Sequence, residues 1–192
     1  MNKLFIIAAL LFLSSCAANK NPHIQINTNF GNIEAELYIG KAPKTVTAFL
    51  SYIDSGFYNN SSFYRVLLEE STSYGNKNSG VIQGGIWQSN NKKAETIPGI
   101  PHESPGQTGL SHTSGTLSLA RSAPGTASTE FFICIGDQTA YDSSKNLNSD
   151  GLGYAAFGKV ISGMDIVRKI QDQPANGQNF IKPVVIFSVK KL

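Results

Sequence analysis

The feature that most constrains the fold is a series of short apolar runs, separated by stretches rich in Gly, Ser, Asn, Thr and Pro. The runs have the length and the β-branched or aromatic content of strands. We expect strands at residues 24–28, 33–39, 63–67, 81–83, 116–120, 131–135, 155–160 and 184–189. Such a strand-rich chain favours a closed antiparallel barrel, because closure removes exposed sheet edges.

Helical periodicity is confined to two segments. Pro43 begins the first, where its fixed φ and missing N–H are harmless, and apolar residues follow at helical spacing from Val46 to Ile53. Gly56 is the expected C-terminal stop of this helix. The second helix is expected over Met164–Gln171. The 192 residues suit one domain with a sizeable core, and no internal repeat or linker divides them.

The N-terminus has the layout of a secretory signal peptide. Residues 1–3 supply a positive charge, residues 4–13 are apolar without interruption, and Leu-Ser-Ser-Cys follows at 13–16. The apolar stretch is shorter than the roughly 20 residues that span a bilayer. Its ending resembles a bacterial lipobox, in which the cysteine is lipidated and becomes the mature N-terminus. The alternative is an ordinary signal peptide followed by a chance cysteine.

The lipobox predicts three parts: a signal peptide at 1–15, a lipidated Cys16 with a tether at 16–22, and one domain at 23–192. Several acyl chains would hold the protein on a membrane of the bacterial envelope. Position 17, directly after the cysteine, holds alanine and not the aspartate that retains enterobacterial lipoproteins at the inner membrane. In a host with two membranes we therefore expect the protein on the outer membrane, facing the periplasm. Cys134 is then the remaining cysteine, and we interpret it as a buried apolar residue.

Several classes of function lack their sequence signals. The net charge is +3 without a run of Lys or Arg, so we expect no nucleic-acid partner. His23, His102 and His112 have no helical metal spacing, and no HExxH or CxxC occurs. Neither GxSxG nor a Walker loop is present. We therefore expect no metal and no cofactor.

Polar residues on two apolar strands indicate a binding groove. By strand alternation, Phe63 and Arg65 share one face and Tyr64 lies on the other. Arg65 therefore either points into solvent beside an exposed Phe63 or lines a pocket with it. Gln83 raises the same question, and the two glycines after it allow another chain to approach the backbone.

Six motifs together resemble the cyclophilin-type peptidyl-prolyl isomerases. They are APKTVTAFL, FYRV, VIQGG, GTLSLAR, STEFFICIGD and AAFGKVISGMDIVRKI, and they occur in the family's order across nearly all of residues 24–189. Each motif alone is weak, but the set is specific. The resemblance implies a mainly β fold, a closed eight-stranded antiparallel barrel capped by two α-helices, with a peptide groove on its outer face.

The resemblance also implies roles for individual residues. Arg65 matches the catalytic arginine, Gln83 the glutamine that hydrogen-bonds the substrate backbone, and Phe132 the floor of the proline pocket. Ala120 and Arg121 match the pair whose backbone meets the peptide. The complete set expected to bind substrate is Phe63, Gln83, Ala120, Arg121, Glu130, Phe132, Tyr141 and Tyr154.

Some positions depart from the family pattern. Arg121 replaces an asparagine, Glu130 a glutamine, Tyr141 a leucine and Tyr154 a histidine, and Gly80 stands where a pocket phenylalanine or similar residue is common. Many cyclophilins bind cyclosporin with the help of a tryptophan, whose place here is held by Ala140, while the only tryptophan is Trp87. We therefore expect weak sensitivity to cyclosporin.

The leading hypothesis is a monomeric isomerase of X–Pro bonds, tethered in the bacterial envelope, whose partners are proline-containing polypeptides that are still folding. The alternative is a prolyl-peptide-binding or chaperone module with weak or no catalysis. The departures at Gly80, Arg121, Glu130 and Tyr154 motivate that alternative.

Overall fold

Strands dominate the computed structural model, which describes residues 21–69, 76–144 and 149–192. The strands are β1 (His23–Thr28), β2 (Gly31–Leu37), β3 (Ser61–Glu69), β4 (Asn76–Gly85), β5 (Thr116–Leu119), β6 (Phe131–Ile135), β7 (Ala155–Ser162), β8 (Ala175–Asn176) and β9 (Asn179–Lys191). The helices are α1 (Pro43–Asp54), α2 (Asn91–Thr96), α3 (Pro105–Thr108) and α4 (Met164–Gln171), and η1 (Thr139–Tyr141) is a 3₁₀ turn.

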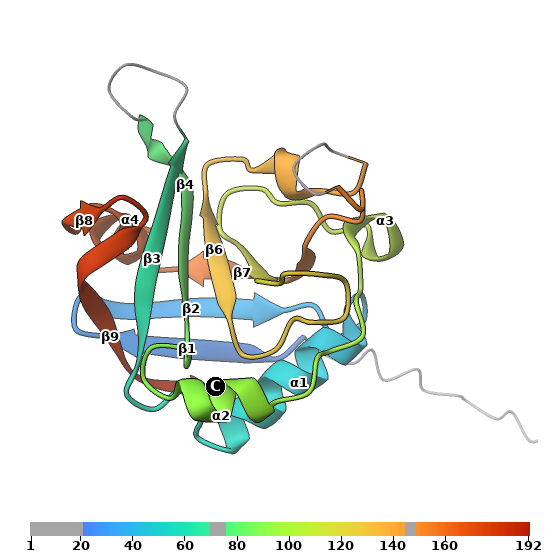
Figure 1. Cartoon of the computed structure of the whole chain (residues 1–192), viewed down its shortest axis with the longest axis horizontal. Coiled ribbons are helices and arrows are strands. Elements are labelled where there is room, and N and C mark those ends of the chain that lie inside the picture. Colours follow the sequence, from blue (N-terminus) through green and yellow to red (C-terminus); the bar gives the residue numbers. More distant parts are fainter. Residues whose placement is uncertain (1–20, 70–75, 145–148) are drawn as a thin grey trace, which may run out of the picture.

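The strands form a closed antiparallel barrel. In the described ranges its order is β1-β2-β7-β5-β6-β4-β3-β9, and pairing of β1 with β9 closes it. Within the same ranges, β8 pairs only with β9 and extends one edge of that strand. Figure 1 shows β3, β4 and β6 crossing in front of β1 and β2. The expectation of a closed eight-stranded barrel is confirmed.

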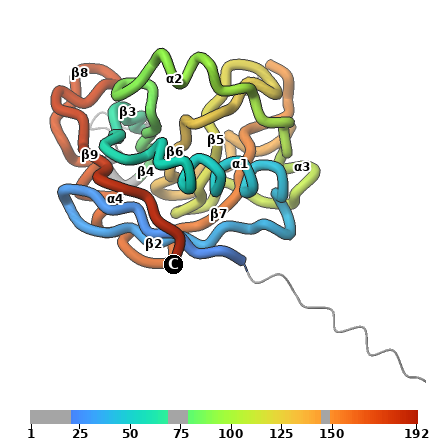
Figure 2. The backbone as a smooth tube through the Cα atoms, turned by 90° about the horizontal axis from the view of Figure 1, so that it is seen from below, coloured from blue at the N-terminus to red at the C-terminus, as the bar shows by residue number. Residues whose placement is uncertain are grey.

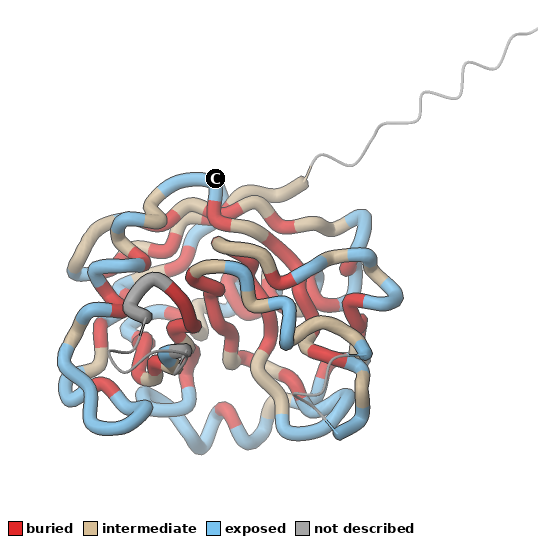
Figure 3. Tube along the Cα trace, turned by 90° about the horizontal axis from the view of Figure 1, so that it is seen from above, coloured by how far each residue is buried: buried red, intermediate tan, exposed pale blue. Residues whose placement is uncertain are grey.

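The alternation of apolar and polar residues along a strand decides which of its faces is turned to the core. In β1 and β2 the apolar residues alternate with polar ones, and Ile26 pairs with Ile33 in the interior. In β6 every residue is buried: one face lines the core, and Phe132 and Cys134 on the other face pack in a second cluster with Val81. Figure 3 shows the buried segments in the centre of the barrel. β6 is therefore covered on its outer face too.

Helices α1 and α4 match the two that the sequence predicts. Pro43 lies in the first turn of α1, Phe49 is fully buried in the core, and Gly56 follows with a positive φ of 69°. Glu103, from a distant loop, accepts the backbone N–H groups of Lys44 and Thr45 and so stabilises the start of the helix. The short helices α2 and α3 were not predicted, because segments of six and four residues are too short to show an apolar period.

The two ends of the barrel domain lie side by side (Figure 2). The backbone N–H of Leu192 donates to the carbonyl of His23 over 3.0 Å. The predicted signal peptide, Cys16 and the tether up to residue 20 lie outside the described residues. Across the ranges that the structure describes, no helix is both long and apolar enough to cross a bilayer.

Candidate active site

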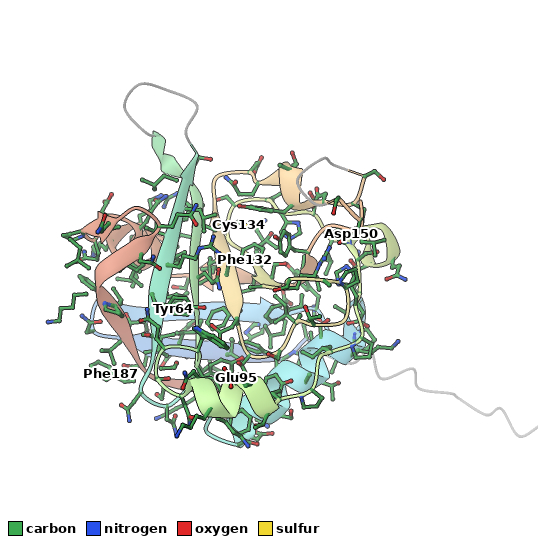
Figure 4. All side chains as sticks on the ribbon, in the orientation of Figure 1. Tyr64, Glu95, Phe132, Cys134, Asp150 and Phe187 are labelled. Atoms are coloured by element: carbon green, nitrogen blue, oxygen red, sulfur yellow. The ribbon has the colours of Figure 1, made fainter. Side chains whose placement is uncertain are left out.

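A groove of about 700 Å³ lies on the outer face of strands β3, β4 and β6. The substrate-binding and catalytic residues expected from the sequence line it, with one exception. Those that line it are Arg65, Gln83, Ala120, Arg121, Glu130, Phe132, Tyr141 and Tyr154. Figure 4 shows Phe132 on β6 and Tyr64 on β3, with β4 between these strands, and Glu95 on α2. The groove therefore combines three adjacent strands with loops from later in the chain.

Phe63 is the exception, and the prediction that it lines the groove is wrong. Its side chain is fully buried in the barrel core and packs edge-on against Phe131, with ring centroids 5.7 Å apart. The cause is a β-bulge, since Phe63 pairs with Gly84 and Arg65 with Gln83. Tyr64 is the extra residue, so strict alternation fails and Tyr64 joins Arg65 on the groove side.

Arg65 is partly buried at one edge of the groove. Its Nη1 donates to Oε1 of Gln83 over 3.2 Å. Its Nε and Nη2 both donate to Oε1 of Gln178, which lies in the turn between β8 and β9. Gln178 could not be predicted from the sequence, because it lies 113 positions from Arg65 and only the pairing of β3 with β9 brings them together. Three nitrogens of the guanidinium are thus held in a defined orientation.

Tyr64 and Glu130 extend this polar side of the groove. Gln83 Nε2 donates to the Tyr64 hydroxyl over 2.9 Å, and that hydroxyl donates to Glu130 Oε2 over 2.6 Å. Glu130 Oε1 accepts the backbone N–H groups of Ile86 and Trp87. Burial raises the pKa of Glu130, and the hydrogen bond from Tyr64 opposes that change. Burial and the neighbouring carboxylate raise the pKa of Tyr64, which therefore keeps its proton.

The opposite side of the groove is a cluster of rings around Phe132. Tyr141 and Tyr154 contact Phe132 with centroid distances of 5.4 and 5.5 Å. The His112 ring stacks beneath Phe132 at 5.9 Å and an interplanar angle of 16°. These contacts hold the Phe132 ring in a fixed orientation at the bottom of the groove. We call Phe132, Tyr141 and Tyr154 the aromatic pocket.

His112 is held from both ring nitrogens. Nδ1 lies 2.7 Å from Asp142 Oδ1, and Nε2 lies 2.9 Å from Ser118 Oγ. A carboxylate only accepts, so Nδ1 carries the hydrogen. Burial lowers the pKa of His112, so the ring is neutral and its Nε2 accepts the Ser118 hydroxyl. The order Asp-His-Ser resembles a catalytic triad, but His112 and Ser118 are fully buried, so this network supports the pocket floor and presents no nucleophile.

The side chain of Arg121 is buried by its own partners at the edge of the groove. The guanidinium lies 5.3 Å from the centre of the Tyr154 ring and donates to the carbonyl of Gly153 and to both oxygens of Asp150. The hydrogen bonds from Arg121 lower the pKa of Asp150 to about 2. Two departures from the family pattern, Arg121 and Tyr154, therefore contact each other, and Arg121 holds the turn that carries Tyr154.

Gly80 is explained by strand pairing. It has a φ of 132°, and a Cβ there would overlap the carbonyl oxygen of Leu67 on the adjacent strand. The neighbouring Val81 and Leu67 line the groove instead. Trp87, which the sequence left without a role, also lines the groove and is 46% exposed, whereas Ala140 lies exposed on η1.

The described residues contain no group of three or more His, Cys, Asp or Glu side chains arranged to hold a metal ion. The residues that gather at the groove are instead one guanidinium, amides, a carboxylate and aromatic rings. Such a set can orient a peptide by hydrogen bonds and enclose a small apolar ring.

Comparison with known proteins decides the family. The sequence model of the cyclophilin type peptidyl-prolyl cis-trans isomerase/CLD family matches residues 23–191. The chain belongs to this family. A peptidyl-prolyl cis-trans isomerase of Acinetobacter baylyi is 39% identical over 184 residues, covering 93% of this chain and 89% of that protein. Peptidyl-prolyl cis-trans isomerase B of Escherichia coli is 38% identical over 149 residues, covering 77% and 83%. This cyclophilin is thus a peptidyl-prolyl isomerase.

Solved structures support the fold of this cyclophilin. A crystal structure of a Cryptosporidium parvum cyclophilin type peptidyl-prolyl cis-trans isomerase matches with a TM-score of 0.70 and 21% identity, covering 90% of this chain and 98% of that one. A second structure of that protein, in the presence of the dipeptide Ala-Pro, matches with a TM-score of 0.67 and 22% identity, covering 87% and 96%.

Proposed function

We propose that this cyclophilin isomerises X–Pro bonds in its groove, with Arg65 as the catalytic residue, and acts on polypeptides that fold in the bacterial envelope. The observation that carries the proposal is the position of the Arg65 guanidinium at the edge of a cavity whose opposite side is Phe132. The Cryptosporidium relative was crystallised in the presence of Ala-Pro, which agrees with a proline peptide as the ligand here.

The chemistry requires rotation about an amide bond. Conjugation gives that bond a barrier of about 18–20 kcal/mol. The barrier falls if the proline nitrogen becomes pyramidal and loses conjugation. A hydrogen bond from a guanidinium N–H to that nitrogen stabilises the twisted state more than the planar one. Arg65 remains charged at any physiological pH and offers fixed donors, so it can act without a proton being transferred.

The other groove residues hold the peptide during the rotation. The proline ring would pack on Phe132, with Tyr141 and Tyr154 at its sides. Gln83 would donate to a backbone carbonyl, while the backbone of Ala120 and Arg121 would meet the peptide chain. One half of the peptide is then fixed in the aromatic pocket and the other is free to turn, which is what isomerisation needs.

The binding module remains the second candidate, because Glu130, Arg121 and Tyr154 depart from the family pattern. A protease-coupled assay on a proline tetrapeptide separates the two functions. Acceleration of cis-to-trans conversion that is lost in Arg65→Ala supports the isomerase. Peptide binding without acceleration by the wild-type protein supports the module.

The envelope location rests on the N-terminal sequence. Residues 1–16 have the order of a signal peptide and lipobox, and we propose that Cys16 is lipidated. The tether would meet the domain near Asn21, whose side chain donates to Glu36 on β2 and lies outside the groove. A lipidated chain could therefore bind substrate while anchored, as a monomer whose groove residues all come from one chain.

Cell fractionation tests the anchor. Wild type should be found with the membranes, and Cys16→Ser should move to the soluble envelope fraction. A Cys134→Ser variant is the matched control, because Cys134 is buried in the domain and should leave the location unchanged. Membrane association of Cys16→Ser equal to that of wild type would contradict the lipid anchor.

A further inference from the structure

A continuous line of hydrogen bonds joins Arg65 to Glu130 through Gln83 and Tyr64. Its donor-to-acceptor distances are 3.2, 2.9 and 2.6 Å in that order. We propose that Tyr64 and Glu130 are positioning residues, which fix the direction of the Gln83 amide so that it presents an N–H to the substrate backbone. This inference deepens the proposed function and rests on the roles given there to Arg65 and Gln83.

The two ends of the line determine its direction. An ionised carboxylate has no hydrogen to donate, and a guanidinium has no lone pair with which to accept. The Tyr64 hydroxyl must therefore donate to Glu130, which leaves its oxygen as the acceptor toward Gln83. Gln83 must turn Nε2 toward Tyr64 and Oε1 toward Arg65. A reversed amide would set N–H against N–H at one end and oxygen against oxygen at the other.

The direction of the amide matters for the substrate. Gln83 Oε1 is occupied by Arg65, and one hydrogen of Nε2 is occupied by Tyr64. The second Nε2 hydrogen remains for the groove, which Gln83 lines. The partner that fits this donor is a peptide carbonyl oxygen beside the proline. The same arrangement also fixes Nη1 of the catalytic guanidinium.

Glu130 itself is held firmly enough to set this direction. Its Oε1 accepts the N–H groups of Ile86 and Trp87 at 2.8 and 3.0 Å and the Thr129 hydroxyl at 3.2 Å. Gly85 has a φ of 148°, and a Cβ there would overlap the Glu130 carboxylate. Tyr64 is 8% exposed, so water has little access to its hydroxyl. The carboxylate therefore directs Oε2 at Tyr64.

A purely structural role for Glu130 is the competing explanation, because its Oε1 supports the backbone at residues 86 and 87. Glu130→Gln separates the two roles. The new amide oxygen can still accept those backbone groups, but its N–H would face Tyr64 and remove the acceptor that sets the direction. A purely structural role therefore predicts little change in kcat/KM for Glu130→Gln, whereas a directing role predicts that kcat/KM falls.

The experiment measures kcat and KM for Glu130→Gln, Tyr64→Phe and the double variant, each at a confirmed folded fraction. We expect kcat/KM to fall about tenfold in each single variant, the effect of losing one well-placed hydrogen bond. The double variant should lose no more kcat/KM than the more damaging single variant, because both changes break the same line. Tyr58→Phe is the matched control for Tyr64→Phe: it removes a buried hydroxyl that donates to the Thr129 carbonyl and takes no part in the line, so it should lower stability while kcat/KM stays unchanged.

Two results would overturn the inference. One is a kcat/KM within about twofold of wild type for Glu130→Gln or Tyr64→Phe; the other is a double variant whose loss is the product of the single losses. Arg65→Ala measured in the same assay identifies which proposal has failed. If Arg65→Ala is inactive while the other variants are normal, only the positioning roles are wrong. If Arg65→Ala is as active as wild type, the catalytic role proposed for Arg65 is wrong.

Discussion

The two sides of the groove are built in different ways. The polar side, from Arg65 to Glu130, is a line of hydrogen bonds in which Arg65, Gln83 and Glu130 line the groove and the mostly buried Tyr64 connects them. The aromatic pocket has its polar support underneath, where His112 is fully buried and bonded to Asp142 and Ser118. Polar groups on one side therefore contact substrate, while those on the other side hold an apolar surface in place.

This difference separates catalysis from stability. Hydrogen bonds that are open to solvent in the groove contribute little to folding, because water replaces them in the unfolded chain. Buried rings and buried polar groups contribute to folding, because removing them leaves cavities or unsatisfied partners. Changes at Arg65, on the open part of the polar side, should reduce activity at nearly constant stability, and changes under the aromatic pocket should reduce both.

The largest expected effect is at Arg65. Arg65→Ala should lower kcat/KM by about 10²–10³-fold, the usual loss when a donor to the transition state is removed. The free energy of unfolding should change little, since the side chain is only partly buried. Arg65→Lys should restore little activity, because a single ammonium cannot reproduce the fork that Gln83 and Gln178 orient. Equal activity of Arg65→Ala and wild type at equal folded fraction contradicts the mechanism.

The next effect is at the floor of the aromatic pocket. Phe132→Ala should raise KM by about tenfold, because the proline ring loses its apolar contact. It should also lower the free energy of unfolding by about 3 kcal/mol, since Phe132 is 96% buried among rings. Phe132→Leu keeps most of the apolar area and should recover part of both losses. If Phe132→Ala loses activity without any loss of stability, Phe132 affects substrate alone and does not contribute to the core.

His112 tests the support beneath the pocket. His112→Ala leaves Asp142 and Ser118 without their partner and opens a cavity, so we expect about 3 kcal/mol of destabilisation by denaturant unfolding. The activity of the folded fraction should fall less than in Phe132→Ala, because no substrate contact is removed. His23→Ala is the matched control, since this histidine side chain is 41% exposed and lies 4.0 Å from Glu36. If His112→Ala lowers the free energy of unfolding no more than His23→Ala does, His112 does not support the pocket.

A smaller effect concerns pH. Burial lowers the pKa of His112 in the fold below its ordinary 6.5, and the hydrogen bond to Asp142 only partly opposes this. The unfolded chain therefore binds more protons as the pH falls through about 6.5, and the free energy of unfolding decreases. His102, whose pKa burial also lowers, acts in the same direction. Unfolding measured from about pH 8 to about pH 5 should show a weaker decrease in a His112→Ala variant. If the free energy of unfolding depends on pH equally steeply in wild type and in His112→Ala, this prediction is wrong.

The smallest expected effect on the enzyme itself is at Ala140, which is exposed on η1 beside Tyr141 of the aromatic pocket. Wild type should be weakly inhibited by cyclosporin, because alanine offers neither an indole N–H nor an aromatic surface. Ala140→Trp should tighten inhibition by about 2 kcal/mol while the uninhibited rate stays the same. Tight inhibition of wild type in a titration would show that Tyr141 or Trp87 already supplies the contact.

Local patterns in the sequence were sufficient to predict the strands of the barrel and its two long helices. The helix predicted over Met164–Gln171 has those bounds, and Pro43 begins the other long helix. Each predicted strand lies within an observed one or extends past it by at most two residues. Apolar period and turn residues act between neighbours in the chain, so they can be interpreted without knowing the fold. Most groove residues were found because short motifs carry them.

Only the tertiary structure decided how those residues face one another. The bulge at Tyr64 moved Phe63 into the core and turned the Tyr64 hydroxyl toward Gln83 and Glu130, and a shift of one residue in a strand leaves no mark in its composition. Gln178 reaches Arg65 across 113 positions, and Asp142 reaches His112 across 30. Such contacts depend on strand register and on closure of the barrel. Periodicity cannot specify them, because it describes which face a residue occupies and not which partner it meets there.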